Sequence, residues 1–246
     1  MRKTQGLSPN QERIMGILEY KKIEIITKKE LLNLIEKHIE IKDPTDLIEK
    51  LIKKSKLVVV KKGIYMIIPF ISIDKKWTLD EYRIIDYLLK DSYYIGLYNA
   101  FNLHGFTEQV PNKVFVFNTK YSSDRKVLYY KIKFFKVKKD KLFGILKKYK
   151  YPYSDKERTI IDALDYPEYL GGLSNIIPRL KDYNKEKLAD YAVKYNSVKI
   201  MKIVGYLTNS PKIYRMLKNN GKLRYYTTVK KTRLNVIDKK WKIRMI

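Results

Sequence analysis

The stretch from Asp43 to Pro69 most constrains what this chain can fold into, because it predicts a basic helix followed at once by a β-hairpin. Asp43 caps the helix, and Pro44 takes its first position, where a missing backbone N–H costs nothing. Leucine and isoleucine then recur at helical spacing and predict a buried face. Gly63 separates the two β-rich runs of the hairpin. These runs are Leu57–Val60 and Ile64–Ile68.

Two more capped helices are expected before this stretch. Ser8 and Thr27 each begin a capping box, so a helix should start directly after each of them. Three capped helices followed by a hairpin have the order and length of a winged helix-turn-helix. The predicted fold class is therefore α+β, with a winged helix-turn-helix DNA-binding domain over residues 1–72 and a larger mixed α+β domain over residues 77–246.

The net charge points to a polyanionic partner. The chain carries a formal charge of +27, and most of the excess lies after residue 110. Such a charge is typical of proteins that bind nucleic acid and, less often, anionic membranes. A general bias of the proteome toward lysine, as in some heat-adapted organisms, is the alternative explanation. By segment, the net charge is +7 over residues 1–76, −3 over 77–110, +11 over 111–150 and +12 over 151–246.

In a winged helix the third helix lies in the major groove and the hairpin flanks the DNA backbone. Basic residues of these elements would then meet phosphates or guanine edges, and the N-terminal arm could enter a minor groove. Acidic residues in the first turns of the third helix oppose this, since Asp46 and Glu49 repel phosphate. A winged helix used for protein contacts, with its lysines merely solvated, is the alternative. The predicted DNA-binding residues are Arg2, Lys3, Lys28, Lys29, Thr45, Lys50, Lys53, Lys54, Lys56, Lys61 and Lys62.

Several function classes are disfavoured. The chain has no cysteine, so disulfides and thiolate metal sites are excluded. It lacks a P-loop and a His-Glu-x-x-His motif, and although Asp162 and Asp165 could share a helix face, neither a third metal ligand nor a base is evident. His104 before Gly105 is better explained as a helix C-cap or core residue. We therefore expect no enzymatic activity, no cofactor and no metal.

The second domain is expected to combine helices with short strands. Ser154 or Asp155 should cap a helix whose acidic residues serve in capping and in ion pairs with Lys156 and Arg158. The sequence has no apolar run long enough to span a bilayer and no signal peptide, so a cytoplasmic protein without membrane contacts is expected. The other expected elements are a helix over 97–104, a strand over 114–117, a strand-rich region over 127–137, helices over 174–182, 185–195, 198–208 and 211–217, and strands within 222–246.

Four segments together resemble the AbiEi-type antitoxin and transcriptional regulator family of type IV toxin–antitoxin (abortive infection) systems. The resemblance covers nearly the whole chain, although Lys156 stands where proline is expected. The segments are the hairpin KLVVVKKGIYMIIP, the helix and strand YYIGLYNAFNLHGFTEQVPNKVFVF, the helix and turn SDKERTIIDALDYPEYLGGL, and the closing IDKKWKIRMI.

The resemblance implies a repressor that binds inverted repeats of double-stranded DNA in its own promoter through the winged helix. It also implies a second domain that counteracts a nucleotidyltransferase-like toxin without forming a stable complex with it. A monomer in solution that binds DNA in pairs is expected. The alternative function is a general DNA- or RNA-binding protein that uses its basic C-terminal domain and has no antitoxin role.

Overall fold

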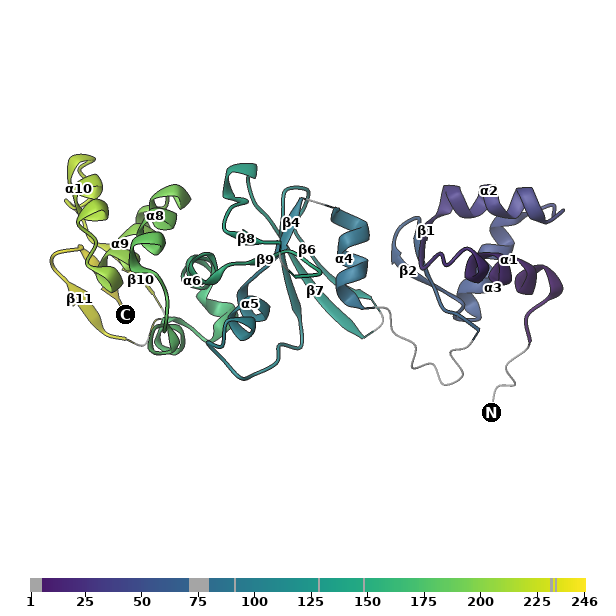
Figure 1. Ribbon diagram of the computed structural model, residues 1–246, viewed down its shortest axis with the longest axis horizontal. Coiled ribbons are helices and arrows are strands. Elements are labelled where there is room, and N and C mark those ends of the chain that lie inside the picture. Colours follow the sequence, from purple (N-terminus) through teal and green to yellow (C-terminus); the bar gives the residue numbers. More distant parts are fainter. Residues whose placement is uncertain are drawn as a thin grey trace. The chain divides into compact units, whose positions relative to one another are not determined.

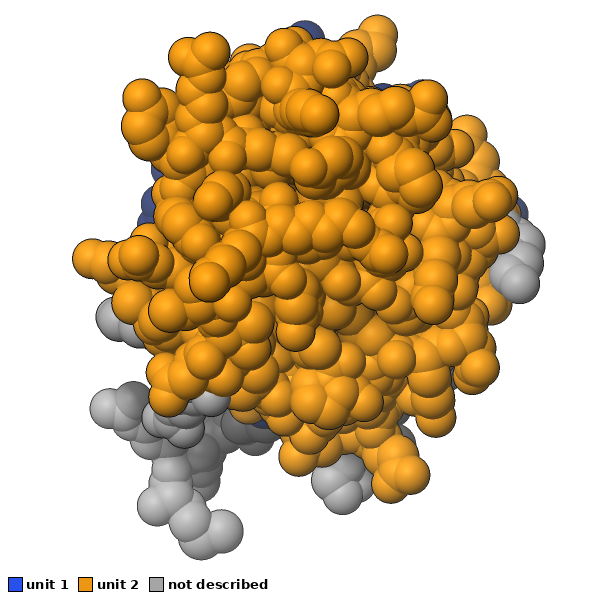
Figure 2. All heavy atoms as spheres, turned by 90° about the vertical axis from the view of Figure 1, so that its left-hand side faces the viewer, with its two compact units in different colours: residues 1–90, 126–130 blue, residues 91–125, 131–246 orange. Residues whose placement is uncertain are grey.

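Runs of helices and runs of strands follow one another along the chain, so the expected mixed α+β class is confirmed (Figure 1). The computed structural model describes residues 6–70, 80–90, 92–127, 129–147, 149–230, 232 and 234–246. It divides into two compact units, shown in blue and orange in Figure 2. Unit 1 comprises residues 1–90 and 126–130, and unit 2 comprises residues 91–125 and 131–246.

Unit 1 begins with three helices and a three-stranded antiparallel sheet of order β1-β3-β2. Gly63 has a φ of +76° in the turn between β2 and β3, a conformation that favours glycine. The helix α4 follows later and belongs to the same unit. The elements are α1 Pro9–Tyr20, β1 Ile25–Thr27, α2 Lys28–His38, α3 Pro44–Lys53, β2 Leu57–Lys61, β3 Ile64–Ile67 and α4 Glu81–Leu89.

Each of the three predicted N-caps forms. The side chains of Ser8, Thr27 and Asp43 all accept hydrogen bonds from backbone N–H groups of the helix that follows. Apolar residues recur at helical spacing in each of these helices and give it one apolar face. These faces pack against the sheet in one core. This core contains Ile14, Met15, Leu18, Ile26, Leu31, Ile35, Leu47, Ile48, Leu51, Leu57, Tyr65 and Ile67.

Unit 2 is built on a six-stranded mixed sheet of order β6-β7-β5-β4-β9-β8. The pairs β4–β9 and β5–β7 are parallel. The helix α5 follows β4, and α6 follows β9, and their apolar residues share one core with the aromatic residues of β4, β5 and β7. The elements are β4 Tyr93–Ile95, α5 Leu97–Leu103, β5 Val114–Asn118, β6 Ser123–Val127, β7 Tyr130–Lys136, β8 Ile145–Leu146, β9 Tyr153–Ser154 and α6 Lys156–Asp165.

The last part of unit 2 combines helices with a small sheet of order β10-β12-β11. Gly205 in α9 lets the Trp241 ring approach closely, since a Cβ there would lie 2.3 Å from a ring carbon. None of the described helices has the length and apolar character needed to cross a membrane. The elements are α7 Leu173–Ile176, α8 Lys185–Tyr195, α9 Val198–Thr208, α10 Pro211–Asn219, β10 Thr227–Val229, β11 Val236–Asp238, β12 Ile243–Met245 and three 3-10 helices at Lys139–Lys141, Pro167–Leu170 and Ile177–Arg179.

The helices predicted over 185–195 and 198–208 have the predicted bounds, but two other predictions were wrong. The helix predicted over 174–182 is only α7 and a 3-10 turn, because Pro178 has no N–H to donate and disfavours a continuing helix. Strands are present within 222–246, as predicted, but the first of these predicted strands, over 223–229, is confirmed only as β10. The carbonyl of Tyr225, just before it, accepts from the Lys202 ammonium at 2.8 Å instead of from a strand N–H.

Candidate nucleic-acid interface

The structure places one set of predicted residues around the turn of the β2–β3 hairpin. The Lys28 N–H donates to the Gly63 carbonyl at 2.8 Å, and Thr27 pairs with Ile64 across the sheet. The N-terminus of α2 therefore adjoins the hairpin turn. We call Lys28, Lys29, Lys61 and Lys62 the hairpin-turn group; Lys29, Lys61 and Lys62 are exposed, and Lys28 is half-buried.

The cap of α2 lies beside this group and carries a negative charge. The Glu30 carboxylate accepts from the Thr27 hydroxyl at 2.7 Å and from the Thr27 N–H at 2.9 Å. These two donors lower the pKa of Glu30 below its usual value, because they stabilise its charged form. Four lysines at one turn nevertheless outnumber this single carboxylate.

A second set lies on the solvent side of α3 and is of mixed sign. Lys50 and Lys53 are exposed, as predicted, but so is Glu49. The Lys50 ammonium lies 2.6 Å from the Asp46 carboxylate, and both side chains are about half exposed. An exposed pair of this kind contributes roughly 0–1 kcal/mol, so Lys50 can exchange the carboxylate for a phosphate at low cost.

Three predicted residues serve the fold of unit 1. Lys54 was predicted to bind DNA, but its ammonium donates to the Gly6 carbonyl at 2.7 Å and to the Gln11 side-chain carbonyl at 2.9 Å. It thus ties the end of α3 to α1. The Lys56 ammonium lies 5.1 Å from the centre of the Phe70 ring. Thr45 is half-buried and donates its N–H to Asp43. Arg2 and Lys3 lie outside the described residues.

The acidic helix of unit 2 contains a buried polar network. Arg158 and Asp162 are both fully buried, with Arg158 Nη2 2.9 Å from Asp162 Oδ1. The Arg158 Nη2–H also donates to the Tyr94 hydroxyl at 2.6 Å, and that hydroxyl lies 3.1 Å from Asp162 Oδ2. Burial raises the pKa of Asp162 to about 6, against the opposing effect of Arg158. This network accounts for Asp162 without a ligand.

The other acidic residues of this helix also have partners. Asp155, and not Ser154, caps α6 by accepting from the Arg158 N–H at 2.8 Å. Asp165 accepts from the Tyr195 hydroxyl at 2.6 Å and pairs with Lys199. The predicted ion pair of the acidic residues with Arg158 is therefore present, whereas the ammonium of Lys156 donates to a backbone carbonyl. Over the described part of the chain, no three His, Asp or Glu side chains gather as metal ligands do.

His104 lies at the C-cap position of α5, which agrees with the C-cap interpretation of its sequence. Its Nε2 is 2.8 Å from the Ser154 carbonyl, so Nε2 carries the proton that is donated. Burial lowers the pKa of His104, more than this hydrogen bond raises it. The ring thus joins the end of α5 to the end of β9.

One basic site was not singled out from the sequence. Five cationic side chains line a cavity in unit 2, and they come from α10, from the loop that follows it and from the turn between β11 and β12. A signal for it existed, since residues 211–246 hold 12 basic side chains against the single Asp238. The spacing of these residues along the chain did not show that they converge. They are Lys218, Arg224, Lys239, Lys240 and Lys242.

Comparison with known proteins identifies a shared fold. No protein-family model matches the chain, and neither does any curated protein. Among solved structures, the chain is similar to the crystal structure of the RV2827C protein from Mycobacterium tuberculosis, with a TM-score of 0.69 and 13% sequence identity. The match covers 97% of this chain and 92% of the other. At this identity, the likeness extends to the mixed α+β architecture of the whole chain.

Proposed function

We propose that unit 1 is a winged helix-turn-helix and that the chain is a DNA-binding transcriptional repressor of its own operon. The observation that carries the proposal is the junction of the α2 N-terminus with the hairpin turn, where the Lys28 N–H donates to Gly63. This junction brings the four lysines of the hairpin-turn group together. The order of α2, α3 and the β2–β3 hairpin is the order found in winged helix-turn-helix domains.

The two lysine groups have different roles in this proposal. The hairpin-turn group contacts phosphates, which position the protein without reading sequence. Lys50 and Lys53 on α3 reach the groove, where a lysine can donate to guanine. Because Asp46 and Glu49 lower the charge of α3, most of the salt-dependent affinity of unit 1 comes from the hairpin-turn group.

The test is binding of the full chain to its own upstream DNA and to a scrambled duplex, titrated with salt. We expect a preference of about 10³ or more for the upstream DNA. The variant Lys28→Ala/Lys62→Ala should weaken binding to both duplexes and reduce the log–log salt slope by about 0.9 per lysine. Lys50→Ala/Lys53→Ala should instead reduce the preference for the upstream sequence.

Lys37→Ala is the matched control. Lys37 is an exposed lysine in the last turn of the same helix as Lys28, about 14 Å further along its axis. Its removal should leave both affinities unchanged. Equal binding to the two duplexes, insensitive to the lysines of unit 1, would exclude the repressor and make the basic second unit the nucleic-acid-binding surface, with RNA as the next ligand to try.

The resemblance to the AbiEi family adds a second part to the proposal, which is that the chain counteracts a nucleotidyltransferase-like toxin. None of the residues described above is assigned to that activity. Co-expression with a toxin of this class from a neighbouring gene tests it by growth. Rescue by the full chain, retained in Lys50→Ala/Lys53→Ala, is expected if antitoxin activity is separate from repression. Failure of rescue by a stably expressed full chain would remove this part of the proposal.

A further inference from the structure

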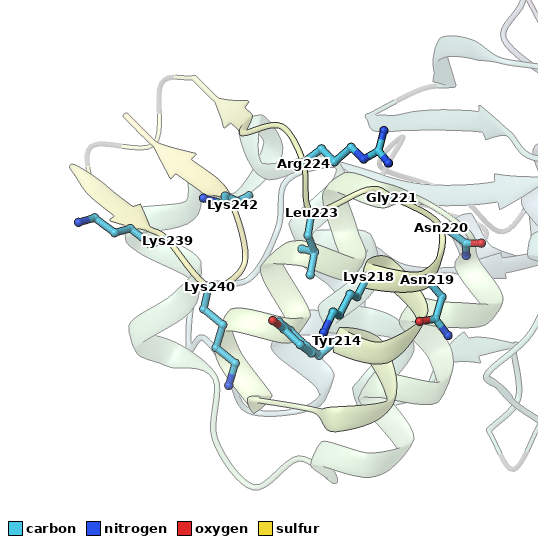
Figure 3. Close-up of a pocket in the computed structure, with 10 residues that line it drawn as sticks. All are labelled: Tyr214, Lys218, Asn219, Asn220, Gly221, Leu223, Arg224, Lys239, Lys240 and Lys242. Carbon is cyan, nitrogen blue, oxygen red and sulfur yellow. The ribbon is translucent and has the colours of Figure 1, made fainter.

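A basic cavity of about 640 Å³ lies near the C-terminus of unit 2, a volume within the range of small-molecule sites. One wall is the last turn of α10 and the loop after it, and the other is the turn that joins β11 to β12 (Figure 3). The wall also contains uncharged residues that could contact the rest of a ligand. These are Tyr214, Asn219, Asn220, Gly221 and Leu223.

The charge of the cavity is not neutralised by its own wall. Of the described residues that line it, five are cationic and none is acidic. Asp238 is the only acidic residue after position 210, and its carboxylate accepts from the Trp241 N–H at 2.7 Å. By contrast, the ammonium of Lys212, in the first turn of α10, lies 2.6 Å from the Asp190 carboxylate. The cavity is thus a local excess of positive charge.

These cations are not needed to close the end of α10. Lysines often satisfy the last carbonyls of a helix and its dipole. Here the carbonyls of Met216, Leu217 and Lys218 already accept from backbone N–H groups of the residues that follow. The Lys240 ammonium does donate to the side-chain carbonyl of Asn209. Its two other donors and those of Lys218 are left for a ligand.

A buried lysine donates hydrogen bonds to the backbone behind the cavity. Lys202 in α9 is 1% exposed, and its ammonium donates to the carbonyls of Tyr225 at 2.8 Å and Lys242 at 3.2 Å. Its third acceptor is the Thr227 hydroxyl. Tyr225 follows Arg224 in the loop after α10, and Lys242 lies in the β11–β12 turn, so Lys202 links the two walls through uncharged acceptors.

The side chains of the cavity have room to gather around an anion. Lys218 extends toward Tyr214 and Lys240 runs past one side of it, whereas Lys239 and Arg224 extend away on opposite sides (Figure 3). The Lys240 ammonium lies 5.7 Å from the centre of the Tyr214 ring. Exposed like charges repel one another, and a multiply charged anion would draw them together.

We propose that this cavity binds a ligand with two or more adjacent phosphate groups, such as the polyphosphate chain of a nucleotide. Lys218 and Lys240 bind the phosphates from the two walls, and Arg224 offers a planar fork for a bidentate contact. The small volume favours a free polyphosphate over a duplex, whose backbone would need an extended groove. All of these residues belong to unit 2, so this proposal does not depend on DNA binding by unit 1.

The test is calorimetric titration of the full chain with tripolyphosphate, with ATP and with a scrambled DNA duplex. We expect tripolyphosphate and ATP to bind, and Lys218→Ala/Lys240→Ala to weaken both by at least about tenfold. Tighter binding of ATP than of tripolyphosphate would show that the nucleoside contacts the uncharged wall. Equal binding would show that the phosphates alone are recognised.

The matched control is Lys212→Ala, which removes a paired lysine from the same helix and should leave both affinities unchanged. Melting curves of each variant show whether it is folded; since these lysines are exposed, no loss of folding is expected. Unchanged affinity in Lys218→Ala/Lys240→Ala would overturn the proposal. So would binding of the duplex alone, which would make this wall a nucleic-acid surface.

Discussion

The helices α3 and α6 carry nearly the same local signals, yet the protein uses them in opposite ways. Both have ten residues, both are capped by an aspartate, and both contain an acidic and a basic residue four positions apart. In α3 the pair is Asp46–Lys50, with about half of each side chain exposed. In α6 the pair is Arg158–Asp162, with neither exposed.

The difference lies in what surrounds each pair. The solvent around α3 weakens the attraction and leaves Lys50 able to change partners. Around α6, the Tyr94 hydroxyl accepts from Arg158 and donates to Asp162, and the Arg158 guanidinium lies 4.6 Å from the centre of the Phe143 ring. Burial makes the second pair part of the core. An acidic and a basic residue four positions apart thus form a replaceable contact on the protein surface and a structurally required ion pair in the core.

The largest expected effect is on the stability of unit 2. Asp162→Asn leaves the Arg158 charge buried without a carboxylate, and we expect a loss of about 3–5 kcal/mol in the free energy of unfolding. Asp46→Asn, the equivalent change on α3, should cost less than about 1 kcal/mol. Urea denaturation of both variants measures this. Losses of similar size would contradict the distinction between the two pairs.

A smaller loss is expected when both buried charges are removed together. Replacing a buried ion pair by apolar residues of similar volume is often nearly neutral, because the desolvation of two charges is avoided. Arg158→Met/Asp162→Leu should therefore be more stable than Asp162→Asn, although the Tyr94 hydroxyl loses its partners. If the double variant proves the less stable, the network stabilises unit 2 by more than charge compensation.

The exposed pair should affect binding more than stability. Asp46→Asn removes the carboxylate that competes with phosphate for Lys50, so we expect DNA affinity to rise by about two- to fivefold, which corresponds to roughly 0.5–1 kcal/mol. Fluorescence anisotropy with a labelled duplex measures it, with Glu12→Gln on α1 as a control of equal charge. A rise of the same size in the control would mean that only net charge matters.

The smallest effect concerns pH. Burial holds the pKa of His104 below its usual 6.5, so the folded state binds its proton less readily than the unfolded state does. The stability contributed by the neutral ring is fully present above pH 6.5 and is lost as pH falls through the lowered pKa. His104→Gln should make the stability of unit 2 less dependent on pH below 6.5. Thermal melts between pH 5 and 8 show it, and parallel curves would disprove it.

Local signals predicted much of the secondary structure correctly. Capping residues act on N–H groups two or three positions away, so Ser8, Thr27 and Asp43 could be recognised without the fold. The same holds for Gly63, whose φ of +76° depends on the turn alone. The strands near the C-terminus were harder to predict, because a strand ends where its carbonyls accept from other donors. The Tyr225 carbonyl, for example, accepts from the Lys202 ammonium.

The sequence by itself determined the mixed α+β class, the capped helices of unit 1 and the excess of positive charge. Only the tertiary structure decided which charged side chains stay exposed to solvent and which form contacts within the fold. In the folded protein Lys54 donates to Gly6, next to α1, and Arg158 is buried with Asp162. Lys202 donates to three oxygens, and the lysines of α10 and of the β11–β12 turn line one cavity. The physical reason is that a cap or a turn depends on neighbours along the chain. The burial and partners of a charge depend on segments that are distant in sequence and meet only in the folded protein.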